Sequence, residues 1–113
     1  MTHEAPRAID KPEEGFFRLR LVRGGPYVPA RIAHDETGWW AEIDGQRYQP
    51  HPDPTHSEGV FRIWHGGRVI DEAEYRHMLA VRGWAERSMP QHPSATPREP
   101  IDAEKLRRLP PLI

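Results

Sequence analysis

Residues 51–58, HPDPTHSE, hold four potential metal ligands within a short stretch. His51, Asp53, His56 and Glu58 combine imidazole and carboxylate groups, which together suit Zn²⁺, Mn²⁺ or Fe²⁺. Their spacing matches no metal motif with a known mechanism, such as H-E-x-x-H, and the prolines between them set no ligand geometry. A metal site is therefore one hypothesis for this segment, and a solvated loop rich in turn-forming residues is the other.

Aromatic and cationic side chains form a second group of candidates. Trp39 and Trp40 are neighbours in a segment with strand periodicity, so they must face opposite sides of a sheet. Most large rings are needed for the core of so short a chain, but an outward ring beside arginines would suit base stacking or peptide binding. The candidates for contact with a protein or nucleic-acid partner are Tyr27, Trp40, Trp64, Trp84, Arg18, Arg20 and Arg31.

Composition excludes several classes of chemistry. The 113 residues contain no cysteine, which excludes disulfides, thiol catalysis and cysteine-ligated zinc or iron–sulfur centres. Ser57 stands between His56 and Glu58, but a nucleophilic triad is defined by geometry and not by adjacency in sequence. We expect no catalytic residues, no cofactor and no enzymatic activity, so the predicted function is a non-catalytic protein-binding or adaptor module. The alternatives are a small nucleic-acid-binding β-barrel and a metal-dependent activity in the loop 51–58.

Charge and hydropathy limit the partners. Sixteen lysines and arginines against seventeen acids give a net charge of -1, which argues against a protein that coats nucleic acid. No apolar run reaches the roughly 20 residues of a membrane span, and residues 1–15 lack the apolar stretch of a secretory signal. We expect a cytoplasmic protein without membrane contact, whose partner is another protein or, as an alternative, a nucleic acid.

The chain is expected to divide into a flexible arm (1–14), a β-rich domain (15–88) and a proline-rich tail (89–113) with a short helix over 102–109. The tail ends in apolar residues, so it is either a docking peptide for a partner or a segment that folds back on its own sheet. The docking candidates are Leu106, Leu109, Leu112 and Ile113.

Period-2 alternation predicts strands over 15–23, 26–34, 38–43, 46–49 and 60–65. Pro29 cannot donate to a sheet ladder, so its strand should be an edge strand or should begin irregularly. Asp44 and Gly45 are typical of a type I′ hairpin turn.

One main helix is predicted over 70–88. Asp71 is its expected N-cap, with Glu74 three residues later as in a capping box. These elements predict an α+β protein with about five antiparallel strands and one main C-terminal helix, arranged as a small sheet or as an SH3-like barrel.

Two resemblances bear on this architecture. The run LRLVRGGPYVPARI (19–32), the Trp39–Trp40 pair, Ile70 and Glu74–Tyr75 resemble segments of small phage- and prophage-encoded proteins of GC-rich proteobacteria. That resemblance implies a phage or mobile-element origin and carries no activity.

The second resemblance is to the PWWP signature, Pro-Trp-Trp-Pro-Ala, and rests on residues 26–30, PYVPA. PWWP domains are small SH3-like barrels with C-terminal helices. Tyr27 and Val28 stand where the family has its two tryptophans, so the resemblance implies a small barrel and not the family's ligands.

Overall fold

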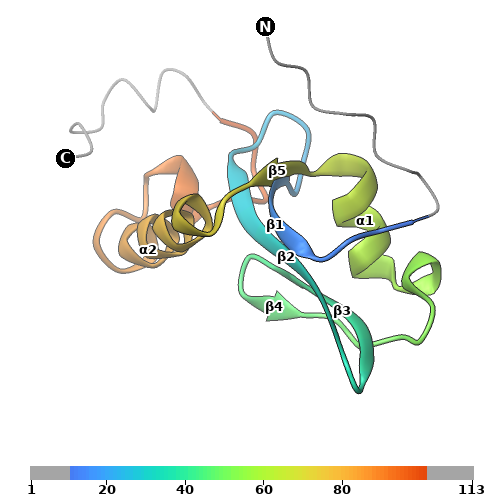
Figure 1. The fold of residues 1–113 in the computed structure, drawn as a ribbon. Coiled ribbons are helices and arrows are strands. Elements are labelled where there is room, and N and C mark those ends of the chain that lie inside the picture. Colours follow the sequence, from blue (N-terminus) through green and yellow to red (C-terminus); the bar gives the residue numbers. More distant parts are fainter. Residues whose placement is uncertain (1–10, 102–113) are drawn as a thin grey trace, which may run out of the picture.

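Alternation of apolar and polar residues produces an open antiparallel sheet with the strand order β4-β3-β2-β1-β5. In this computed structural model, which describes residues 11–101, one helix lies on each face of the sheet (Figure 1). The predicted α+β class is confirmed as an open sheet and not as a closed barrel. The elements in chain order are β1 (Gly15–Arg20), β2 (Tyr27–Asp35), β3 (Gly38–Ile43), β4 (Gln46–Arg47), the 3₁₀ turn Pro54–His56, α1 (Glu58–Gly66), β5 (Arg68–Ile70), α2 (Glu72–Ser88) and the 3₁₀ turn Pro93–Ala95.

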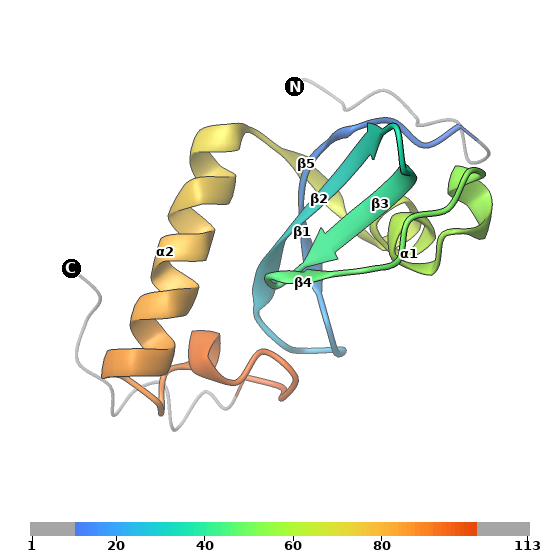
Figure 2. The same ribbon diagram turned by 90° about the horizontal axis from the view of Figure 1, so that it is seen from below.

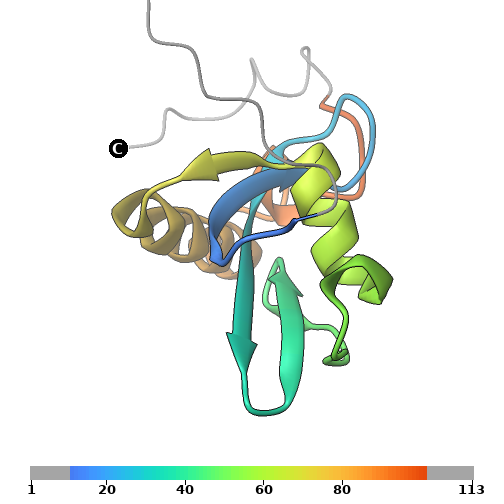
Figure 3. The ribbon, with the colours of Figure 1, turned by 45° about the vertical axis from the view of Figure 1, so that its right-hand side comes forward.

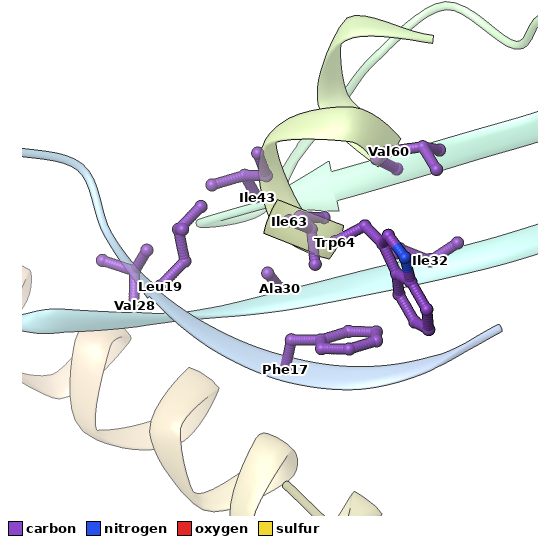
Figure 4. Close-up of a cluster of buried hydrophobic side chains, with 10 residues drawn as sticks. Phe17, Leu19, Val28, Ala30, Ile32, Ile43, Val60, Ile63 and Trp64 are labelled. Carbon is purple, nitrogen blue, oxygen red and sulfur yellow. The ribbon is translucent and has the colours of Figure 1, made fainter. Parts of the chain in front are cut away.

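The hydrophobic core lies between the sheet and α1 (Figure 4). Alternate residues of a strand point to one face, so β1, β2 and β3 each supply the apolar set predicted from their period. Helix α1 supplies the opposite wall with residues spaced three and four apart. The buried core residues are Phe17, Leu19, Val28, Ala30, Ile32, Ala41, Ile43, Val60, Ile63 and Trp64.

The prediction of a strand over 60–65 is wrong, because this segment lies inside α1. Alternation of Phe61 and Ile63 with polar neighbours suggested a strand, but Val60, Ile63 and Trp64 also have helical spacing. Phe61 is 50% exposed, whereas Ile63 is fully buried. The fifth strand is the short segment after the helix, where Val69 pairs with Phe17 of β1.

The expectation of an edge strand at Pro29 is also wrong, since β2 lies in the middle of the sheet. Register explains how a proline fits there. β3 pairs with β2 only from Ala30 onward, and the Pro29 carbonyl accepts a hydrogen bond of 2.9 Å from the Asp44 amide of the turn. The missing N–H of Pro29 therefore points toward the β3–β4 turn and not into the ladder with β1.

The predicted turn and helix signals are confirmed. Asp44 and Gly45 have φ of 52° and 80°, as a type I′ turn requires. The strand that follows is shorter than predicted and ends at Arg47. The Asp71 carboxylate accepts a hydrogen bond of 2.7 Å from the Glu74 amide and so caps α2.

Helix α2 covers the second face of the sheet, and the chain after it turns back toward the β1–β2 loop (Figure 2). Pro97 is buried, and the Ile101 amide donates to the Gly24 carbonyl at 2.8 Å. The proline-rich segment up to residue 101 thus packs beside α2 and the β1–β2 loop, while the choice between a tail that folds back on the sheet and one that docks to a partner stays a prediction. Residues 1–10 of the arm, the helix predicted over 102–109 and the docking candidates Leu106, Leu109, Leu112 and Ile113 lie outside the described residues.

Among the helices of the described part, none is both long and apolar enough to cross a membrane.

Candidate functional site

A pocket of about 220 Å³ opens between β2, α2 and the 3₁₀ turn Pro93–Ala95. Figure 3 shows α2 lying across one face of the sheet, on the side opposite α1. The pocket is lined by Tyr27, Pro29, His77, Met78, Val81, Arg82 and Ser94.

Three separate segments position this lining. Tyr27 and Pro29 are two apart in β2, so they share the face that looks toward α2. The α2 contributors follow the helical period and form one side of the helix. Ser94 is held in its turn by a hydrogen bond of 3.1 Å from its amide to His92 Nδ1, and the His92 ring packs edge-on against Trp84.

The chemistry of the pocket combines apolar walls with free polar groups. Pro29, Met78 and Val81 supply apolar surface. The Tyr27 hydroxyl, the His77 imidazole and the Ser94 hydroxyl form no hydrogen bond with any other described residue. Such a combination suits a ligand that buries apolar surface and is oriented by a few polar contacts.

Arginines flank the Tyr27 side of the pocket. The guanidinium carbons of Arg18 and Arg20 lie 4.7 and 4.5 Å from the Tyr27 ring centroid, within cation–π range. Arg82, at the other end of the lining, donates to both carboxylate oxygens of Asp44 at 2.8 and 3.1 Å. The charge of Arg82 is therefore neutralised, while the Tyr27 side keeps a positive excess.

No family model, curated protein or solved structure matches this chain.

Two of the other predicted aromatic candidates, Trp64 and Trp40, are buried, whereas Trp84 is partly buried. Trp64 is 5% exposed and belongs to the core. Trp40 is 8% exposed, donates from Nε1 to Asp35 at 2.9 Å, and has the guanidinium carbons of Arg31 and Arg47 at 5.4 and 3.9 Å from its ring centroid. Of the predicted candidates, Tyr27 lines the pocket, Arg18 and Arg20 flank it, and Trp84 supports the turn that carries Ser94.

Three of the four predicted metal ligands hold one another in a turn, and the fourth, Glu58, is the first residue of α1. His51 Nδ1 accepts from the Asp53 amide at 2.9 Å, and Asp53 Oδ2 lies 2.8 Å from His56 Nδ1. Hydrogen bonds from the Thr55 hydroxyl and amide, with His56, lower the pKa of Asp53 to about 2. In residues 11–101 no group of three or more histidines and acids is placed to hold a metal ion, which favours the turn hypothesis.

Sequence reasoning missed His77, Met78, Val81 and Ser94. Met78 and Val81 lie within the helix predicted over 70–88, but a pocket beside them requires β2 and the turn at Ser94 to be in place. Those three segments are far apart in the chain, so no local pattern could have indicated the site.

Proposed function

We propose that this chain is a non-catalytic binding module that captures a partner polypeptide by one apolar side chain, inserted in the pocket between β2, α2 and Ser94. The observation that carries the proposal is the preformed apolar pocket whose lining holds three polar groups without a hydrogen bond to any other described residue. Its volume lies below the roughly 300–1,000 Å³ of pockets that enclose a whole small ligand. A single side chain of a longer partner fits this size better.

The placement of the aromatic rings favours a protein partner over the nucleic-acid alternative. Base stacking needs an accessible ring face. Trp40 is covered by Arg31 and Arg47, and Trp64 is inside the core. The resemblance to phage-encoded proteins suggests a host or phage polypeptide as the partner.

A selection from a random peptide library displayed on phage tests the proposal. The full chain is used as bait, and the selected peptides are titrated against wild type, Val81→Trp and Leu79→Trp. The Val81 substitution fills the pocket, whereas Leu79 is exposed on α2 and does not line it. We expect affinity to fall at least about tenfold with Val81→Trp, since the anchor loses its burial, and to be unchanged with Leu79→Trp.

Mapping of amide shifts on ¹⁵N-labelled wild type gives a second readout that does not depend on a variant folding. Bound peptide should shift the amides of Tyr27, Val81 and Ser94 and leave Phe61 of α1 unchanged. Selection of no pocket-dependent peptide, or shifts confined to the α1 side, would overturn the proposal. Retention on single-stranded DNA at low salt with shifts at Trp40 would replace it with the nucleic-acid alternative.

A further inference from the structure

We infer that the partner segment carries an aspartate or glutamate next to its apolar anchor, and that Arg20, assisted by Arg18, receives this carboxylate. The inference rests on the proposed function, because it assigns the chemistry of the segment that the pocket holds.

Register places both arginines beside the pocket. Arg20 pairs with Tyr27 and Arg18 pairs with Pro29, and directly opposed residues of antiparallel strands project from the same face. Tyr27 and Pro29 both line the pocket. Two guanidinium groups therefore lie within 5 Å of one pocket-lining ring, on the side of β2 that faces β1.

Several guanidinium N–H donors of Arg18 and Arg20 have no hydrogen-bond acceptor among the described residues. Arg20 is exposed and has no carboxylate within 4.0 Å among the described residues. Arg18 Nη1 lies 3.6 Å from Glu74 Oε1, and the Arg18 side chain is still 38% exposed. Guanidinium N–H groups that face solvent beside the pocket can donate charge-assisted hydrogen bonds to an incoming carboxylate, and such bonds are stronger than those between neutral groups.

Glu74 offsets one of the two positive charges beside Tyr27, so the exposed Arg20 leaves one guanidinium for an incoming anion. One guanidinium can hold one carboxylate through two parallel N–H···O hydrogen bonds. An unmodified polypeptide supplies such a carboxylate from Asp or Glu, so we assign an acidic side chain and leave a phosphorylated one as an outcome of the test.

Peptides selected for pocket-dependent binding provide the test. We expect them to be enriched in Asp or Glu within two positions of the apolar anchor. Changing that acid to its amide, or Arg20 to Gln, should each weaken binding about fivefold at low salt, and combining the two changes should weaken it little further. High salt should remove most of this difference.

Arg87→Gln is the matched control, because the substitution removes the same positive charge as Arg20→Gln. Arg87 is exposed in the last turn of α2 and does not line the pocket. Peptides that depend on Val81 but show no acid enrichment and no response to Arg20→Gln would overturn this inference and leave the proposed function standing. A phosphoserine peptide that binds more tightly than its aspartate version would also overturn it. If no peptide depends on Val81, the proposed function itself fails.

Discussion

The two helices cover opposite faces of one sheet by different chemistry. Helix α1 spans nine residues and buries four of them, including Val60 and Ile63, in a continuous apolar core. Helix α2 spans seventeen residues but buries only Tyr75 and Ala85.

Polar and aromatic contacts hold α2 on its face. Arg82 of α2 forms an ion pair with Asp44, and Glu74 Oε1 lies 3.6 Å from Arg18 Nη1 of β1. The Tyr75 ring packs on Phe16 with centroids 4.9 Å apart, and burial raises the pKa of its hydroxyl. The α1 face thus supplies most of the hydrophobic stabilisation, whereas the looser packing of the α2 face leaves room for a pocket.

Truncation of a core residue on α1 should have the largest effect. Ile63→Ala removes a fully buried side chain and should lower the free energy of unfolding by about 2–5 kcal/mol. Leu79→Ala on the exposed side of α2 should change it by less than about 0.5 kcal/mol. Urea denaturation measures both, and equal losses would contradict the assignment of the core to the α1 face.

The same substitution should have opposite signs in the two helices. A Cβ on Gly59 would lie 2.8 Å from Tyr48 Cγ and 2.9 Å from Ala41 Cβ, so Gly59→Ala should destabilise the protein by about 1–3 kcal/mol. In α2 a Cβ on Gly83 meets only the flexible end of Arg87, and Gly83→Ala should stabilise by up to about 1 kcal/mol. Thermal melting of both variants measures the sign of each stability change. A stabilising Gly59→Ala would contradict the close approach of α1 to β3.

Loss of the ion pair between α2 and the β3–β4 turn should loosen α2 selectively. The side chains of Asp44 and Arg82 are only 14% and 17% exposed, and asparagine tolerates the positive φ of residue 44. Asp44→Asn should cost about 1.5 kcal/mol and reduce amide-exchange protection in α2 more than in α1. Arg76→Gln, which breaks an exposed pair with Glu72, should cost less than about 0.5 kcal/mol. Equal loss of amide-exchange protection in α1 and α2 would contradict the view that the two helices are held on the sheet independently of each other.

The two helix starts should respond differently to loss of their caps. Asp71→Ala removes the hydrogen bond to the Glu74 amide and should cost about 1 kcal/mol. Ser57 precedes α1 but makes no side-chain cap bond, and its buried hydroxyl has no hydrogen-bond partner within residues 11–101. Ser57→Ala should therefore be neutral or slightly stabilising in urea denaturation, and a loss as large as that of Asp71→Ala would reveal a partner for this hydroxyl.

The smallest effect concerns the turn that leads into α1. The pKa of Asp53 is lowered from 3.8 to about 2, so the folded state binds fewer protons than the unfolded state in this range. The stabilisation from Asp53 should be complete above pH 3.8 and lost as the pH falls toward about 2.

Carboxyl-carbon NMR titration should show the pKa of Asp53 rising in Thr55→Ala. Thr37→Ala should instead raise the pKa of Asp35, which Thr37 lowers, and a shift at both aspartates in either variant would contradict these local causes.

Sequence patterns predicted the elements whose cause is local. β1, β2 and β3 follow from period-2 alternation, the turn at Asp44 from two residues that tolerate positive φ, and the start of α2 from the cap at Asp71. The segment 60–65 was assigned incorrectly because three residues spaced at 60, 63 and 64 fit both a helix and part of a strand. Of the site, only Tyr27, Arg18 and Arg20 were among the predicted residues.

The sequence by itself determined which residues alternate, where the hairpin turns and where α2 begins, because each depends on neighbours a few positions apart. Tertiary structure alone decided that 60–65 is a helix, that a strand with Pro29 lies inside the sheet, and that Tyr27, Val81 and Ser94 share a pocket. These outcomes depend on how apolar surface is divided between the two faces of the sheet, and that division is a property of the whole packed chain.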